Sequence, residues 1–384
     1  MKNVLLIGIG GVYNYGCEAI VRGTVDILKA YNDRIQISYA SYNYADDIKR
    51  LVNCDINIIE RKRAGRWHWR NILRKLLSLF NISYALPYDS TDWLDGYDTV
   101  FSIGGDIYTL NSDGHYNQSL PLFLEKCQAK GMKYVLWGAS VGKFENNPEA
   151  LRFYTKHLKK IDLIVARENV TVDYLNTLGV IDNVVFAPDP AFFVEYDNSN
   201  IKKNNSKMVL GVNLSPLSSL YKYRNLDKAV SMQSNAIYKL AKKLNCKILL
   251  LPHVISSDIN DNDLSFMERM AQMISDKGCD VDIVGNDPGF IGIKQDITKC
   301  DFVVAARMHC AINAITMNVP TLFLSYSDKA VGMANMVYGD SKAVIPLHDL
   351  EDYDRVADII KNWNCKSLVS TLKSYKYKTV LSKI

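Results

Sequence analysis

The chain has 384 residues, of which 48% are hydrophobic and 23% are charged, and its formal net charge is +5. This length allows two domains with full-sized cores, and the composition is ordinary for a globular protein. The mild positive charge permits an anionic substrate or a membrane-surface contact. It does not require nucleic acid, for which the sequence contains no known motif.

The eight cysteines are scattered, and no two of them have the Cys-x-x-Cys spacing of a zinc or redox site. They fit small buried residues of a reduced compartment. The N-terminus runs directly into an apolar strand, and no apolar run approaches the roughly 20 residues that span a bilayer. We therefore expect a cytoplasmic protein, and we expect no metal site.

The N-terminal segment predicts the opening of a Rossmann-like domain. Val4–Ile9 is a continuous apolar run, as in a central parallel strand, and a glycine-rich turn and a predicted helix, Ala19–Lys29, follow it. The glycines lack the G-x-G-x-x-G spacing, and no acidic residue ends the next predicted strand, Ile35–Tyr39. A dinucleotide cofactor is therefore not expected.

Residues 61–80 differ from their surroundings, because they carry seven Arg and Lys residues and no acid. Their apolar residues fall at helical spacing on one face. Such a helix can lie on an anionic membrane surface. Alternatively, it is an ordinary surface helix that buries its apolar face on the domain, and the sequence slightly favours this second interpretation.

The remaining strands of the first half end in small or polar residues. Thr99–Ile103 is followed by Gly104-Gly105-Asp106, and Ile161–Ala166 is followed by Arg167. Further predicted strands are 134–137 and 184–187, with helices over 120–130 and 170–178. Because parallel strands end at one edge of a sheet, this pattern predicts an open α/β sheet with a site along that edge.

A polar stretch, residues 197–207, separates this half from a second α/β pattern. The predicted organisation is an N-terminal domain over 1–196, a linker over 197–207, a C-terminal domain over 208–350 and a basic helical tail over 351–384. Strands of the second domain are predicted at 208–213, 247–251, 281–284, 302–305 and 321–325.

Arg307 and His309 follow the apolar run Phe302–Ala305 and precede a predicted helix, Cys310–Met317. A guanidinium and an imidazole at the carboxyl end of a strand, beside a helix N-terminus, can form an anion and proton-transfer site. The alternative is an ion-paired arginine and a histidine that caps a turn. Spacing alone favours that structural alternative.

An ordered series of short motifs resembles the polysaccharide pyruvyl transferase family from residue 4 to about residue 340. The motifs are GGVYNYGCEAI (10–20), FSIGGD (101–106), LWGASVG (136–142), AREN (166–169), APDPAF (187–192), ARMHCAINAITMNVP (306–320) and LSYSDKAVG (324–332). The resemblance implies two Rossmann-like α/β domains facing across a cleft, as in GT-B glycosyltransferases. Two departures, Gly16-Cys17 for a common Gly-Asp and Gly104-Gly105-Asp106 for three glycines, bear on the acceptor.

The resemblance further implies transfer of the pyruvyl group of phosphoenolpyruvate to a sugar, commonly as a cyclic ketal. Phosphoenolpyruvate carries a phosphate and a carboxylate, which suit bidentate arginines. Histidine's ordinary pKa, about 6.5, suits acid–base work, so His309 is expected to be the acid or the base. The expected catalytic residues are His309 and Arg307. The expected donor site is Arg167, Arg307, Met308, His309 and Lys329, and the expected acceptor contacts are Asn14, Gly104, Gly105, Asp106 and Tyr326. For Arg167 an ion pair with Glu168 or Asp189 is an equally open alternative, and for Asn14, Asp106 and Tyr326 taken singly the sequence favours a structural role.

Two other functions stay open. A nucleotide-sugar glycosyltransferase on the same frame would commonly use a glutamate to hold the ribose, and no glutamate lies near residues 301–326. A non-catalytic glycan-binding relative is the other. The partners that we expect are phosphoenolpyruvate as donor, with no cofactor, and a sugar or lipid-linked glycan acceptor. We expect no nucleic acid, and peripheral contact with the inner membrane face would run through residues 61–80.

Overall fold

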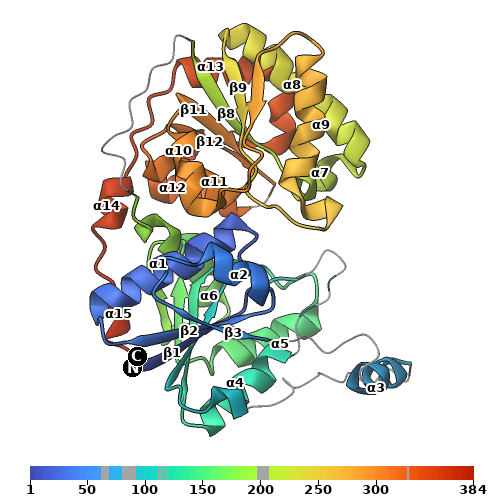
Figure 1. The fold of residues 1–384 in the computed structure, drawn as a ribbon. Coiled ribbons are helices and arrows are strands. Elements are labelled where there is room, and N and C mark those ends of the chain that lie inside the picture. Colours follow the sequence, from blue (N-terminus) through green and yellow to red (C-terminus); the bar gives the residue numbers. More distant parts are fainter. Residues whose placement is uncertain are drawn as a thin grey trace. The chain divides into compact units, whose positions relative to one another are not determined.

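The computed structural model describes residues 1–61, 69–79, 92–110, 114, 116, 119–196, 207–326 and 328–384. The chain divides into two compact units, each with a parallel sheet flanked by helices (Figure 1). Unit 1 comprises Met1–Gly11, Thr24–Asp189 and Lys376–Ile384, and unit 2 comprises Val12–Gly23 and Pro190–Tyr375.

The sheet of unit 1 has the strand order β3-β2-β1-β4-β5-β6-β7. Its strands are β1 (Asn3–Ile7), β2 (Gln36–Ser41), β3 (Asn57–Glu60), β4 (Thr99–Ile103), β5 (Lys133–Ala139), β6 (Leu163–Ala166) and β7 (Val184–Phe186). The helices are α1 (Tyr15–Tyr31), which begins in unit 2, and α2 (Tyr44–Arg50), α3 (Trp69–Ser78), α4 (Ser119–Ala129), α5 (Pro148–Leu158), α6 (Asn169–Thr177) and α15 (Lys378–Leu381).

The sheet of unit 2 has the order β10-β9-β8-β11-β12-β13. Its strands are β8 (Val209–Asn213), β9 (Lys247–Leu250), β10 (Val281–Ile283), β11 (Phe302–Ala305), β12 (Thr321–Ser325) and β13 (Val344–Pro346). Its helices are α7 (Pro216–Tyr223), α8 (Leu226–Leu244), α9 (Asp263–Ser275), α10 (Gly289–Ile297), α11 (Met308–Thr316), α12 (Asp328–Tyr338), α13 (Tyr353–Lys361) and α14 (Val369–Lys373), with a 3-10 turn, η3, at Ile259–Asp261.

Both sheets have the Rossmann strand order, in which the chain reverses direction across the sheet after the third strand. That reversal leaves a switch point between β1 and β4 in unit 1 and between β8 and β11 in unit 2. The predicted fold class, two Rossmann-like α/β domains, is therefore confirmed.

The apolar runs of the sequence arise because the central strands are covered on both faces. In β11, Val303 and Ala305 join a core with α10, α11 and α12, whereas Phe302 and Val304 join a core with α8, α9 and α13. A strand with two buried faces needs apolar residues at consecutive positions, not at alternate ones. This explains why the strands could be recognised from the sequence.

The two units differ from the predicted boundaries at two segments. Residues 12–23 belong to unit 2, where Tyr15 and Ala19 enter the core, although they precede most of unit 1 in the chain. The tail divides, because Tyr377 of unit 1 packs against Trp137 with ring centroids 5.3 Å apart. The predicted linker, apart from Lys207, lies outside the described residues. Among the described helices, none has the length and apolarity that crossing a membrane requires.

Lys294 of α10 is fully buried in unit 2. Its Nζ donates to Thr316 Oγ1 over 2.9 Å and lies 4.7 Å from the centroid of the Phe290 ring. Burial, with the charge of Lys373, lowers the pKa of Lys294 to about 7. In the unfolded chain a lysine pKa is about 10.4, so between these values the unfolded state binds more protons and the free energy of unfolding rises with pH.

We expect Lys294→Met to stabilise the protein at pH 6 by roughly 2–4 kcal/mol, because a buried charge is removed at nearly constant volume. The gain should shrink as the pH rises from about 7 toward 10, where the folded lysine is already neutral. Urea unfolding at several pH values measures this. Lys299→Met is the matched control, since that side chain is 58% exposed and should change little. A gain independent of pH would contradict the assignment.

Candidate functional site

Asn213, the last residue of β8, links the segments that follow β9 and β11 at the carboxyl edge of the unit 2 sheet. Asn213 lies opposite Ala305 of β11, at the switch point. Its Oδ1 accepts a hydrogen bond from the backbone N–H of Arg307 (2.8 Å), and its Nδ2 donates to the carbonyl of Leu251 after β9 (2.9 Å). One buried amide side chain therefore fixes where Arg307 leaves the sheet.

The guanidinium of Arg307 is held by two carboxylates. Its Nη2 lies 2.8 Å from Asp261 Oδ1 and 2.8 Å from Asp263 Oδ1, and its Nε lies 3.2 Å from Asp263 Oδ1. Burial opposes the charge, but the two carboxylates hold the pKa of Arg307 above its ordinary value. Nη1 makes no hydrogen bond to the described residues. The arginine is therefore charged and oriented, with one nitrogen left for a ligand.

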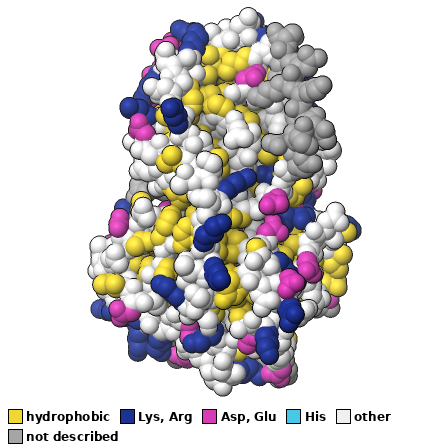
Figure 2. Space-filling model, turned by 90° about the vertical axis from the view of Figure 1, so that its left-hand side faces the viewer, with side chains coloured by type: hydrophobic (Ala, Val, Ile, Leu, Met, Phe, Trp, Pro, Cys, Tyr) yellow, Lys and Arg dark blue, Asp and Glu magenta, His cyan; other side chains and the backbone are white. Residues whose placement is uncertain are grey.

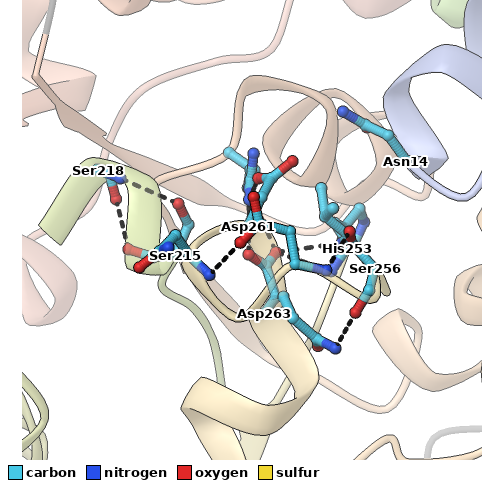
Figure 3. Close-up of polar contacts among 12 residues, drawn as sticks. Asn14, Ser215, Ser218, His253, Ser256, Asp261 and Asp263 are labelled. Carbon is cyan, nitrogen blue, oxygen red and sulfur yellow. Dashed lines mark hydrogen bonds and ion pairs between the residues drawn. The ribbon is translucent and has the colours of Figure 1, made fainter. Parts of the chain in front are cut away.

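Asp263 completes this arrangement from the start of α9. It is fully buried, and its Oδ2 accepts from the backbone N–H groups of His253 (3.1 Å) and Val254 (3.2 Å). Figure 3 shows Asp261, Asp263 and His253 gathered at this edge. The backbone of the loop after β9 fixes the carboxylate of Asp263, and this carboxylate in turn fixes the guanidinium of Arg307.

His309 lies in the first turn of α11 and packs against the backbone of Gly16. A Cβ built on Gly16 would overlap the Nδ1 of His309 and lie 2.8 Å from its Cγ. The N–H of Gly16 donates to the Oδ1 of Asn14 (2.8 Å), which fixes the turn. The predicted helix was Cys310–Met317, and the observed helix begins two residues earlier, at Met308. Met308 and His309 are therefore helical residues.

Hydrogen bonds from Tyr13, Tyr15 and Glu18 attach the segment 12–23 to the rest of unit 2. Asn14 forms an antiparallel bridge with Val254, and the N–H of Tyr15 donates to the carbonyl of His253 (2.9 Å). The Oε2 of Glu18 accepts from the N–H of Phe290 (2.8 Å) in the first turn of α10. These bonds bring Asn14 beside the His309 edge, although the sequence placed it in the N-terminal domain.

His253 is a buried histidine beside this edge. It is 1% exposed, and its Nδ1 lies 3.1 Å from the carbonyl of Leu251, so Nδ1 carries the proton. Burial, together with the charges of His309 and Arg307, lowers the pKa of His253 to about 3. The imidazole therefore stays neutral at physiological pH.

We expect Gly16→Ala to lower turnover by roughly 100-fold, because a misplacement of about 1 Å can cost that much and the new Cβ must displace the imidazole of His309. Steady-state kinetics and thermal unfolding, measured together, separate this effect from loss of fold. Gly285→Ala is the matched control, since a Cβ at Gly285 meets nothing within 4 Å. Equal kinetics of the two variants would show that the contact with Gly16 does not position His309.

Tyr326 and Lys329 follow β12, so the chain brings them to the same edge of the sheet. The ring of Tyr326 stacks on that of Tyr221, with centroids 5.5 Å apart, and Tyr326 is 43% exposed. Lys329 lies in the first turn of α12. Of the predicted site residues, Asn14, Arg307, Met308, His309, Tyr326 and Lys329 are thus all in unit 2.

The other predicted residues lie at the carboxyl edge of unit 1. Arg167, which follows β6, is 2% exposed, and its Nε donates to Ser140 Oγ while its Nη1 donates to Asp189 Oδ2 (2.8 and 2.9 Å). Glu168 and Asp106 lie 3.6 and 3.8 Å from the guanidinium. A Cβ on Gly105 would lie 2.5 Å from Nη2, so a glycine lets the guanidinium pack on the backbone.

Although burial opposes its charge, these carboxylates hold the pKa of Arg167 above the ordinary value. The ion pair with Asp189 is the alternative that the sequence left open for this arginine. The carboxylate side chain of Asp106 is 62% exposed.

Sequence reasoning missed four residues of the unit 2 edge: Asn213, Asp261, Asp263 and Gly16. Asn213 ended a predicted strand and could have been chosen on that ground. Asp263 lies 44 residues before Arg307 in the chain, and only the fold brings the two together. Gly16 appeared within a motif, but its role as a contact of His309 depends on the placement of segment 12–23 in unit 2.

Comparison with solved structures identifies the fold. Anabaena HepE in complex with UDP is 12% identical with a TM-score of 0.57, covering 100% of this chain and 97% of that one. A glycosyltransferase from Rickettsia africae (14%, TM-score 0.57, 100% and 94%) and the UDP-GlcNAc 2-epimerase of Methanocaldococcus jannaschii (11%, TM-score 0.56, 100% and 99%) are similar to it as well. At these identities the likeness establishes the fold, which is of the GT-B kind.

A family model described as polysaccharide pyruvyl transferase matches residues 14–328. The match begins in segment 12–23 and extends beyond Arg307 and His309, so it includes both the Asn14–Gly16 turn and the α11 edge. It also covers most of the chain, including the described strands from β2 through β12. The chain therefore belongs to the polysaccharide pyruvyl transferase family, and it is a transferase of polysaccharide biosynthesis.

Proposed function

We propose that this protein transfers the pyruvyl group of phosphoenolpyruvate to a sugar of a polysaccharide or lipid-linked glycan precursor, forming a cyclic ketal and releasing phosphate. The observation that carries the proposal is the unit 2 edge. There, a charged arginine with one open nitrogen, the N-terminus of α11 and His309 follow one another in the chain, inside the family match.

The proposed donor residues are Arg307, Met308, His309 and Lys329 in unit 2 and Arg167 in unit 1. The phosphate and carboxylate of phosphoenolpyruvate need strong donors, which the Nη1 of Arg307 and the first backbone N–H groups of α11 can supply. Lys329 adds a charge from the start of α12. These groups can neutralise the departing phosphate, so the proposal uses no metal and no cofactor.

The reaction balances without an external oxidant or reductant. One sugar hydroxyl oxygen attacks C2 of the enol, the methylene carbon gains a proton, and the bond from C2 to the phosphate oxygen breaks. A second hydroxyl closes the ketal, and of the two hydroxyl protons one ends on the methyl group and one on phosphate. His309 moves one of these protons, as the acid for the methylene or as the base for the hydroxyl.

The acceptor half comprises Asn14, Gly104, Gly105, Asp106 and Tyr326. Asn14 lies at the His309 edge, and the exposed ring of Tyr326 offers a face on which a sugar can stack. In unit 1 the exposed carboxylate of Asp106, which follows Gly104 and Gly105, can accept from a sugar hydroxyl.

A nucleotide-sugar glycosyltransferase is the second candidate, because HepE was solved with UDP and UDP-glucose on a similar fold. It predicts turnover with a nucleotide-sugar and none with phosphoenolpyruvate. A non-catalytic glycan-binding relative is the third, and it predicts sugar binding with no turnover of either donor.

The test is incubation of the protein with phosphoenolpyruvate and a panel of glycosides, with and without nucleotide-sugars. Released phosphate and the mass of the sugar are followed together. Phosphate release that matches a pyruvyl mass gain, without nucleotide, is the expected result. Turnover with a nucleotide-sugar alone would replace the proposal with the second candidate.

A further inference from the structure

The α3 helix and the residue that follows it expose four large apolar side chains. Trp69, Ile72, Leu76 and Leu79 are 60%, 44%, 51% and 74% exposed. Their spacing of three or four residues places them in one row along the helix. Four large apolar side chains in one exposed row are typical of an interaction surface.

This exposure decides between the two interpretations that the sequence left open. An ordinary surface helix would bury this row against its own domain. Leu73 and Leu77 are half-buried, but none of the four residues of the row is. The face is therefore available for an external surface.

The charges that the sequence places on this helix are of one sign. Residues 61–80 contain seven Arg and Lys residues and no acid, and Arg70, Arg74 and Lys75 fall within the helix itself. On the face of the protein in Figure 2, by contrast, basic side chains are interspersed with acidic ones. An apolar row on a helix whose charged residues are all positive is complementary to a surface that is apolar beneath and anionic on top.

We propose that α3 docks on an anionic lipid bilayer, with its apolar row at the boundary between headgroups and acyl chains and its basic residues among the lipid phosphates. A helix of ten residues is about 15 Å long and lies in the plane of the interface. Docking there would bring the enzyme to a lipid-linked acceptor, but the proposal concerns binding alone and does not rest on the proposed reaction.

A second copy of the chain is the rival occupant of this face. Two such helices packed through their apolar rows would set basic residues against basic residues with no acid from 61–80 to neutralise them. Like charges that face each other are unfavourable at an interface, whereas anionic lipid supplies the missing sign. The charge pattern therefore favours the bilayer.

Vesicle flotation tests the proposal with the full-length protein. Wild type should float with vesicles of phosphatidylcholine containing about one-third phosphatidylglycerol, and binding should weaken on raising salt. Leu76→Asp/Leu79→Asp should weaken this binding by roughly tenfold or more, because two buried apolar contacts are lost. The matched control is Ile181→Asp, at another exposed apolar residue of unit 1 (60% exposed), which should bind as wild type does.

Light scattering without lipid, on the same variants, completes the experiment. A wild type that stays out of the lipid fraction overturns the proposal, as does equal binding of wild type and the double variant. Equal binding to pure phosphatidylcholine overturns the anionic part. A wild-type dimer that the double substitution dissociates, with no lipid binding, assigns the face to a second copy.

Discussion

We expect His309→Ala to lower turnover with phosphoenolpyruvate by roughly 100- to 10,000-fold, the range for removal of a general acid or base. Binding of phosphoenolpyruvate should weaken much less, because Arg307 is held by Asp261 and Asp263 and not by His309. The signature is therefore a fall in kcat at a nearly unchanged dissociation constant. Single-turnover kinetics and calorimetric titration with phosphoenolpyruvate measure the two quantities.

His348→Ala is the matched control, since His348 lies in the same unit, pairs with Asp349 and is 65% exposed. It should leave both quantities unchanged. His309→Gln adds a second variant, which keeps a polar side chain against Gly16 but cannot titrate. Undiminished turnover in either His309 variant would remove this histidine from the chemistry, whereas loss of binding alone would assign it to the donor site.

The strands could be predicted from the sequence because the apolar pattern that identifies a buried strand lies within a few consecutive residues. The run from Phe302 to Ala305 must be apolar at every position to fill two cores, and a run of that kind is visible without a structure. The end of such a strand then marks the edge where Arg307 and His309 lie. The fold class and the position of Arg307 and His309 at the edge of the sheet could thus be predicted.

The partners of these residues could not be predicted, because they come from distant parts of the chain. Asp263 meets Arg307 through a helix start 44 residues earlier, and Gly16 meets His309 through a segment that leaves its neighbours in the sequence. No periodicity or characteristic spacing in the sequence indicates either contact. The contacts depend on hydrogen bonds of segment 12–23, two of which join backbone groups, and backbone groups carry no sequence signal.

Arg167 shows a different limit, because the sequence left two roles open for it. Its place after a strand suggested a ligand, and an ion pair with Glu168 or Asp189 was the equally open alternative. The structure shows both carboxylates beside the guanidinium. Asp189 and Glu168 are 0% and 1% exposed, so the arginine is what allows two acids to be buried at the edge of unit 1. An arginine can hold such acids and still offer a face to a ligand, and only a measurement of stability separates the two roles.

We expect Arg167→Met to lower the free energy of unfolding by roughly 3–5 kcal/mol, because its removal leaves buried carboxylates without a counter-charge. Urea unfolding followed by tryptophan fluorescence measures this, with Trp137 reporting on unit 1. Arg152→Met, at an exposed position of the same unit, is the control and should change little. The double variant Arg167→Met/Asp189→Asn should recover part of the lost stability, since it removes one of the buried negative charges that the arginine no longer neutralises. Unchanged stability together with weaker binding of phosphoenolpyruvate would instead make Arg167 a ligand-binding residue first.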